Sequence, residues 1–151
     1  MSLTNGEIIT MVLAVAVLAA VAYANRYLFG AQSKLRGVST MEIVYLVIGI
    51  PGAVLGYYYN FQYFDLYGAA AGWRHFCVRL FDNPAAASVS TDLIVANLLF
   101  IPIWTVVDGR RHGMRATWLY FPLSLLISVS FTMGVFLALR ERQLRWQQAN
   151  G

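Results

Sequence analysis

Four long apolar stretches constrain this chain more than any other feature of its sequence. They cover residues 8–24, 41–64, 91–107 and 118–139, and within them only Glu42 and Asp92 are charged, each beside the start of its stretch. A helix of about 20 residues crosses a hydrocarbon layer about 30 Å thick, because each residue rises about 1.5 Å. The sequence therefore predicts an all-α polytopic membrane protein, a bundle of four transmembrane helices forming a single domain over residues 1–151.

The first of these stretches could be a helix or a signal peptide. It ends in Ala22, Tyr23 and Ala24, a small-residue pattern that resembles a cleavage site. No Lys or Arg precedes the stretch, however, and Glu7 occupies the place where a signal peptide carries positive charge. We therefore expect a retained helix. Hydrophobic residues make up 59% of the chain and charged residues 12%, which excludes an ordinary soluble domain.

All eleven Lys and Arg residues lie outside the apolar stretches and flank their ends. This placement predicts anchoring at the interface and contact with anionic membrane lipid, and it argues against nucleic-acid binding. With four helices, the loops at 25–40 and 109–116 share one side and carry six basic residues, against five on the other side. This small bias favours both termini outside, in a bacterial inner membrane.

Two patterns of small residues predict helix packing. Gly52 and Gly56 are four residues apart in the second stretch, a spacing that lets another helix approach closely. A stripe in the fourth stretch repeats every four residues and is interpreted as a helix contact, with a polar substrate path as the alternative. Its members are Ser124, Ser128 and Thr132. Between the second and third stretches, residues 73–81 have the pattern of a short amphipathic helix lying in the interface.

The end of the second stretch could hold a ligand. It contains Tyr57, Tyr59 and Tyr63, with Asn60 among them, and such a cluster is either an interfacial aromatic belt or part of a pocket for an apolar ligand. Asn97 lies deep in the third stretch with no charge nearby, so we expect it to bond to another helix or to a ligand.

Carboxylates near the membrane are the candidate catalytic groups. Asp65 and Asp92 are expected at the same membrane face as the aromatic cluster, where they could converge on one small group. Asp92 is alternatively a cap in the first turn of the third helix. Asp108 beside Arg110 and Arg111 is interpreted as an interfacial ion pair. The sequence shows no metal-ligand spacing, no phosphate-binding loop and a single cysteine, Cys77, so neither a metal nor a cofactor is predicted.

Several motifs in the second half of the chain resemble a known family. They are the run from Phe81 to Ala87, then Asp92, Trp104, the run from Asp108 to Met114, and Arg140-Glu141-Arg142. Together they resemble an uncharacterised bacterial membrane family, domain of unknown function 2834, over about residues 45–144, with an extra helix at the N-terminus. The resemblance implies a helical membrane fold and marks a few candidate positions without assigning them roles. These positions are Asn83, Asp92, Asp108 and Arg111.

Two hypotheses for the function follow from these features. The first is a noncatalytic protein that binds a lipophilic molecule or serves as an accessory subunit of a membrane complex, as a homo-oligomer or with other proteins. The second is a membrane enzyme acting on an isoprenoid or lipid in the manner of a terpene cyclase. In it, Asp65 or Asp92 would donate a proton, and tyrosines would shield the developing cation.

Overall fold

The computed structural model describes residues 5–30 and 37–150, and every regular element in these two ranges is helical. The α-helices are α1 (Asn5–Ala24), α2 (Thr40–Tyr67), α3 (Trp73–Arg79), α4 (Pro84–Val95), α5 (Ile101–Arg111), α6 (Tyr120–Leu126) and α7 (Val129–Asn150). Short helical turns join them: η1 (Arg26–Leu28), η2 (Gly68–Ala70), η3 (Ala96–Phe100) and η4 (Thr117–Leu119). The all-α prediction is confirmed.

Three helices are long and apolar enough to cross a membrane, in agreement with the first three apolar stretches. They extend over Gly6–Ala24, Thr40–Ala70 and Pro84–Arg111. The third is built from α4 and α5, joined by the π-helical turn η3. It begins earlier than the sequence suggested because Asn83 caps it, its side-chain oxygen accepting the N–H of Ala86 at 2.9 Å, and Pro84 follows at a position that suits proline. Asp92 therefore lies inside this helix, beyond its first turn.

The fourth apolar stretch folds as a hairpin, so the continuous helix predicted for residues 118–139 is absent. α6 ends at Leu126 and α7 begins at Val129. The rings of Tyr120 and Phe136 lie 5.0 Å apart, whereas one continuous helix would separate them by about 24 Å. Ser128 makes the break, because its hydroxyl accepts the N–H of Phe131 at 3.1 Å and so caps α7. The serine and threonine stripe therefore does not form one helix face.

α7 packs antiparallel along α2, and glycines make the contact close. A Cβ built on Gly134 would lie 2.6 Å from the carbonyl oxygen of Tyr45, and one built on Gly52 would lie 2.6 Å from the Cβ of Ser130. Gly56 is less crowded, since its Cβ would meet only the carbonyl oxygen of Ile127 at 3.8 Å. These contacts bring the hairpin against the first two-thirds of α2.

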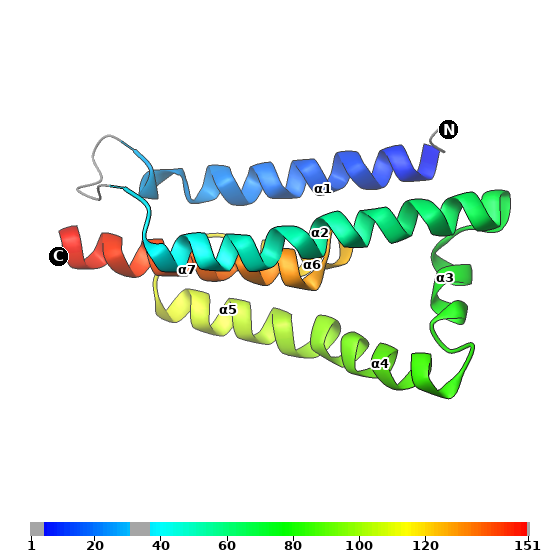
Figure 1. Cartoon of the computed structure of the whole chain (residues 1–151). Coiled ribbons are helices and arrows are strands. Elements are labelled where there is room, and N and C mark those ends of the chain that lie inside the picture. The colour runs from blue at the N-terminus through cyan, green and yellow to red at the C-terminus, as the bar shows by residue number, and fades with distance from the viewer. Residues whose placement is uncertain (1–4, 31–36, 151) are drawn as a thin grey trace.

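The hairpin changes which segments share an end of the bundle. We call the end that carries the end of α1, the start of α2, the α5–η4 connection and the end of α7 the basic end. Its described arginines are Arg26, Arg110, Arg111, Arg115, Arg140, Arg142 and Arg145. The start of α1 and the end of α7 lie at opposite ends of the bundle (Figure 1), which differs from the expectation that both termini share one side.

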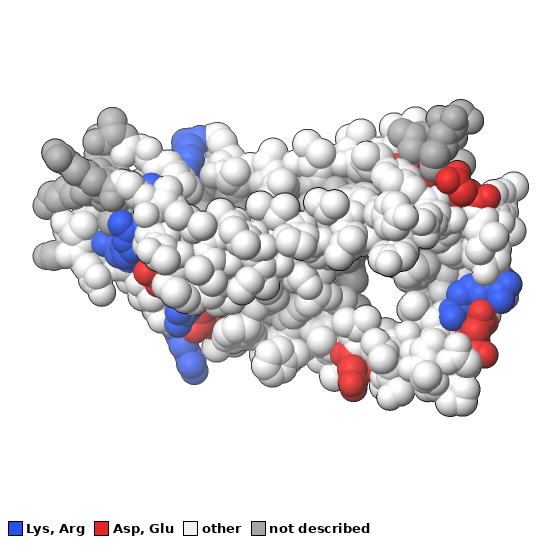
Figure 2. Space-filling view, viewed as in Figure 1, with Lys and Arg blue, Asp and Glu red and all other residues white. Residues whose placement is uncertain are grey.

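Packing is dense at the basic end and sparse at the other. The buried core of Val21, Met114, Leu119, Tyr120, Leu123 and Phe136 lies among α1, α6 and α7 and the turns beside them. The hairpin turn meets α2 at Tyr57, whose hydroxyl donates to the carbonyl of Leu126 at 3.1 Å. Beyond this level the described bundle consists of α1, residues 58–67 of α2 and α4, closed at the end by α3. Figure 2 shows a hollow between α2, α3 and α4.

α3 extends over Trp73–Arg79 and is shorter than the predicted interfacial helix of residues 73–81. Phe76 of α3 is half-buried, while Trp73 and Cys77 are exposed. Phe76 packs edge to face on Tyr63, with ring centroids 5.5 Å apart. α3 therefore closes the sparse end of the bundle against the end of α2.

Candidate functional site

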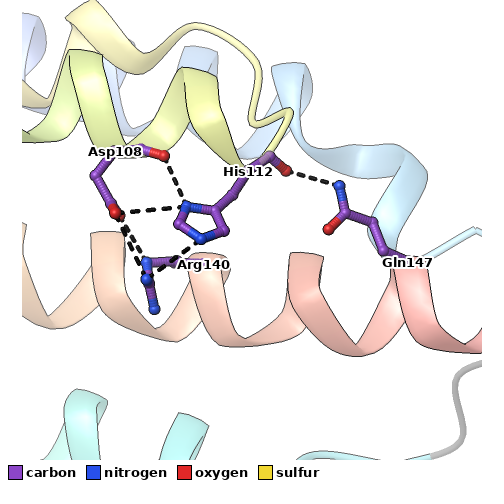
Figure 3. Close-up of polar contacts among 4 residues, drawn as sticks. All are labelled: Asp108, His112, Arg140 and Gln147. Atoms are coloured by element: carbon purple, nitrogen blue, oxygen red, sulfur yellow. Dashed lines mark hydrogen bonds and ion pairs between the residues drawn. The ribbon is translucent and has the colours of Figure 1, made fainter.

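A network of polar side chains at the basic end joins α5 to α7 (Figure 3). Arg140 donates from Nε to a carboxylate oxygen of Asp108 at 2.6 Å. His112 lies one helical turn after Asp108, with Nδ1 2.8 Å from the Asp108 carbonyl oxygen and 3.5 Å from its carboxylate. A guanidinium nitrogen of Arg140 is 3.4 Å from His112 Nε2. Since guanidinium groups only donate, Nε2 accepts and Nδ1 carries the proton.

The local sequence around Asp108 ends a helix in a tight turn. A Cβ on Gly109 would lie 2.5 Å from a methyl carbon of Thr117, so only glycine lets η4 approach α5 here. Gly113 has a φ of 71°, the left-handed conformation that commonly ends a helix. Gln147 then donates to the carbonyl of His112 at 2.9 Å and ties this turn to α7. The turn thus presents Asp108 and His112 toward Arg140.

The sequence interpretation paired Asp108 with its neighbours Arg110 and Arg111. The structure instead gives it Arg140, on a different helix, while Arg110 and Arg111 are exposed. Asp108 and His112 are four residues apart in the sequence, a spacing that places two side chains side by side on a helix. This part of the network could therefore have been predicted. Nothing in the local sequence pointed to Arg140, because the hairpin alone decides which residues of α7 reach α5.

A second ion cluster joins α2 to α7 and was missed by sequence reasoning. Glu42 is 4% exposed and accepts a hydrogen bond from Arg142, which is 8% exposed, at 2.8 Å. Arg145 forms a second ion pair with the same carboxylate. Arg142 also donates to the carbonyl of Leu28 at 3.2 Å, which connects η1 to this cluster. Glu42 thereby pairs with two arginines while also completing the capping box with Ser39.

Tyr27 links η1 to α7 at the same end. Its hydroxyl is 2.5 Å from the side-chain oxygen of Gln143, and its ring packs edge to face on Trp146 with centroids 5.6 Å apart. The guanidinium of Arg115 lies 4.4 Å from the centre of the Tyr27 ring. Burial raises the pKa of the Tyr27 phenol, and the positive charge of Arg115 opposes part of this shift. The phenol therefore remains a hydrogen-bond donor through the ordinary pH range.

An apolar groove lies between α1 and α2, and aromatic residues contribute to its α2 wall. The groove has a volume of about 520 Å³ and a wholly apolar lining. Its lining residues are Met11, Ala53, Val54, Tyr57, Tyr58 and Phe61. Of the predicted ligand residues, only Tyr57 contributes to this wall. Met11 was missed because the sequence does not show that α1 runs beside this part of α2.

The other predicted ligand residues are dispersed. Tyr59 is 62% exposed and faces away from the protein, and Asn60 is half-buried on α2. Tyr63 contacts His75 Nδ1 at 2.7 Å and so joins α2 to α3. Asn83 is the cap of α4. Asn97 lies in the π-helical turn η3, where its side-chain oxygen is buried without a hydrogen-bond partner.

The two candidate catalytic carboxylates are not brought together around the groove. Asp65 near the end of α2 and Asp92 within α4 are both exposed. Neither of them lines the groove between α1 and α2, whose lining contains no carboxylate. Among the described residues there is also no group of three or more His, Cys, Asp and Glu side chains placed to hold a metal ion.

Comparison with known families gives one match. The sequence model of the family described as "Protein of unknown function DUF2834" matches residues 44–142, about two-thirds of the chain. The chain belongs to the DUF2834 family. The match includes Asp108, His112 and Arg140, so this network lies within the part shared with other DUF2834 proteins. α1 lies outside the match and is an additional apolar helix. No curated protein and no solved structure matches significantly.

Proposed function

We propose that this DUF2834 protein is a noncatalytic integral membrane protein that binds a lipophilic molecule in the groove between α1 and α2. The observation that carries the proposal is the groove itself, about 520 Å³ of space with a wholly apolar wall. The groove is wide open, so a ligand in it would contact the surrounding bilayer as well as the protein. The groove lies where the hairpin no longer fills the bundle, so a ligand there replaces packing that the protein does not supply.

The wall of the groove favours an extended hydrocarbon over a polar ligand. The hydroxyl of Tyr57 is engaged by the carbonyl of Leu126, so this residue presents its ring and not its polar atom. Tyr58 and Phe61 add two further rings, and Ala53 and Val54 supply a smooth aliphatic surface. The enzyme hypothesis has less support, because a general acid would have to reach the ligand and no carboxylate lines this groove.

Mass spectrometry of the protein purified in mild detergent tests the proposal. We expect a lipophilic molecule to copurify with the unmodified chain and to be lost in Ala53→Trp, which fills the groove. Val47→Trp is the matched control, because Val47 is on the same helix, is 62% exposed and does not line the groove. Equal retention by both variants, or no copurifying molecule in the unmodified chain, would overturn the proposal.

A role as accessory subunit of a membrane complex is the second candidate, favoured by the large exposed area. The chain exposes 9,520 Å², whereas a compact monomer of 16.9 kDa is expected to expose about 7,700 Å². α4 contributes to this excess, since it packs mainly on the η3 turn that follows it. Chemical crosslinking in native membranes, followed by size analysis, distinguishes a homo-oligomer or a larger complex from a monomer surrounded by lipid.

We further propose that the protein lies in a bacterial inner membrane with the basic end in the cytoplasm. Seven of the nine arginines in the described ranges are at that end, while Arg74 and Arg79 are at the other. This asymmetry is much stronger than a four-helix arrangement would give, because the hairpin returns the arginines of α7 to the basic end. The start of α1 is then outside and the end of α7 inside.

Cys77 provides a direct test of this orientation. It is the single cysteine of the chain, and it is exposed in α3 at the end opposite the arginines. A membrane-impermeant maleimide added to intact spheroplasts should label Cys77. It should not label a cysteine introduced at Asn150 in a Cys77→Ser background. The reverse labelling pattern would place the basic end outside.

A further inference from the structure

The basic end has more arginines than its carboxylates can neutralise. Its described acidic residues are Glu42, Asp108 and Glu141. Glu42 pairs with Arg142 and Arg145, and Asp108 pairs with Arg140. The carboxylates of Glu42 and Asp108 are therefore both paired with arginines of α7. Four exposed arginines contributed by η1, α5 and the α5–η4 connection have no described carboxylate partner. They are Arg26, Arg110, Arg111 and Arg115.

Aromatic rings hold two of these four arginines at the edge of α1. The guanidinium carbon of Arg26 lies 3.9 Å from the centre of the Tyr23 ring, and that of Arg115 lies 4.4 Å from the centre of the Tyr27 ring. Stacking of this kind restrains a guanidinium while leaving its in-plane N–H groups free to donate. Tyr23 lies near the end of α1 and Tyr27 lies in η1, which follows it, so both arginines lie at the basic end of the molecule.

The position of this edge indicates that the acceptor lies at a membrane surface. Tyr23 is within the Gly6–Ala24 span, and the exposed aromatic residues Phe29 and Trp118 lie at the same end. Exposed aromatic rings are enriched at the level of lipid headgroups. The arginines therefore lie at the depth of the lipid headgroups.

Charge separation along the molecule agrees with this placement (Figure 2). The described part of the basic end has seven arginines against three carboxylates. The remainder of the described chain has Arg74 and Arg79 against four carboxylates, namely Glu7, Asp65, Asp82 and Asp92. An anionic surface would attract the first end and repel the second.

We propose that Arg26, Arg110, Arg111 and Arg115 bind the headgroups of anionic phospholipids, with the stacked pair Arg26 and Arg115 contributing most. A phosphodiester offers two oxygens that match the paired N–H groups of a guanidinium, and an arginine already held on a ring loses little freedom on binding. This headgroup surface lies at the opposite end of α1 from Met11, whose side chain lines the apolar groove. It would operate whether or not that groove binds a lipophile.

Native mass spectrometry of the full chain tests this proposal. The protein is released from nanodiscs of phosphatidylcholine alone and from nanodiscs of phosphatidylcholine mixed with phosphatidylglycerol, and the retained lipids are counted. We expect the protein to retain phosphatidylglycerol preferentially. In Arg26→Gln/Arg115→Gln, the affinity for phosphatidylglycerol should fall about fivefold for each arginine removed. Arg26→Lys/Arg115→Lys should recover part of the binding, because charge returns without the planar geometry.

The controls separate a headgroup surface from general attraction. Arg74→Gln removes an exposed arginine at the other end and should leave phosphatidylglycerol retention unchanged. If the arginines bind anionic headgroups within the bilayer, added inorganic phosphate should displace little phosphatidylglycerol. Equal retention of the two lipids, an equal loss in Arg74→Gln, or full displacement by phosphate would each overturn the proposal.

Discussion

The ring of Tyr120 packs edge to face on the ring of Phe136, with centroids 5.0 Å apart and an interplanar angle of 80°. This contact is possible only because the chain reverses direction between the two residues, and it places both at the buried core of the basic end. The reversal decides which polar residues of α7 meet α2 and α5. The two ion clusters described at the basic end are therefore consequences of the hairpin.

The cap of α7 should be needed for the hairpin. Ser128→Ala removes the acceptor for the N–H of Phe131 and is expected to lower the free energy of unfolding by about 1 kcal/mol. Thermal unfolding followed by tryptophan fluorescence in detergent measures the change. Ser88→Ala, at an exposed position of α4, should have little effect. If the two variants are equally stable, Ser128 does not stabilise the turn.

Removal of the carboxylate at Glu42 should destabilise the basic end strongly. Glu42→Gln leaves the buried guanidinium of Arg142 without a counter-ion, and breaking a buried pair in this way costs about 3–5 kcal/mol. The double variant Glu42→Leu/Arg142→Leu removes both charges and should recover much of the loss. Chemical unfolding of the three proteins gives the comparison. A single variant as stable as the unmodified chain would contradict the pairing.

Substitutions of the glycines at the α2–α7 contact should have unequal effects on stability. In Gly134→Ala the new methyl group would lie 2.6 Å from the backbone oxygen of Tyr45, so the helices must separate, at a cost of about 1–3 kcal/mol. In Gly56→Ala the nearest atom is 3.8 Å away, which is ordinary van der Waals contact. Melting temperatures of the two variants provide the measurement. An equal decrease in both would show that the antiparallel packing is not as described.

Alkaline pH should weaken the contact made by Tyr27. Its pKa is raised in the folded protein above the ordinary value of 10.0, so the neutral phenol stabilises the fold below that value. This contribution is lost as the pH rises through the folded pKa. Tyr27→Phe should be about 1 kcal/mol less stable at neutral pH, and the difference should shrink above pH 10. If Tyr27→Phe is as stable as the unmodified chain at neutral pH, the hydrogen bond of Tyr27 does not stabilise the fold.

Much of the fold could be predicted from apolar length alone, and the chief exception has a local cause. The stretches at 8–24, 41–64 and 91–107 lie within long helices, although Pro51 lies inside the second and the π-helical turn η3 interrupts the third. The fourth stretch is equally apolar, yet Ser128 can act either as a small packing residue or as a cap. Spacing does not distinguish these roles. The packing of α7 against α2 and α5 determines that Ser128 acts as the cap.

The candidate site was harder to predict for the same reason. Tyr57 was identified because an aromatic cluster is visible in the sequence, but its neighbour in the groove, Met11, comes from a separate helix. Glu42 was interpreted only as part of a capping box, since its partners Arg142 and Arg145 are about 100 positions away. Side chains that meet across the bundle become visible only when the path of the chain is known.

The partial depth of the hairpin also leaves the two ends of the molecule unequally filled with helices. Near the basic end the cross-section contains α1, α2, α5, α6 and α7, while near α3 it contains α1, α2 and α4. The α3 end has fewer helices but is not narrower, since α2 and α4 diverge there around the hollow (Figures 1 and 2). A bilayer that holds this protein must fill that hollow with acyl chains, so lipid becomes part of the packing at this end.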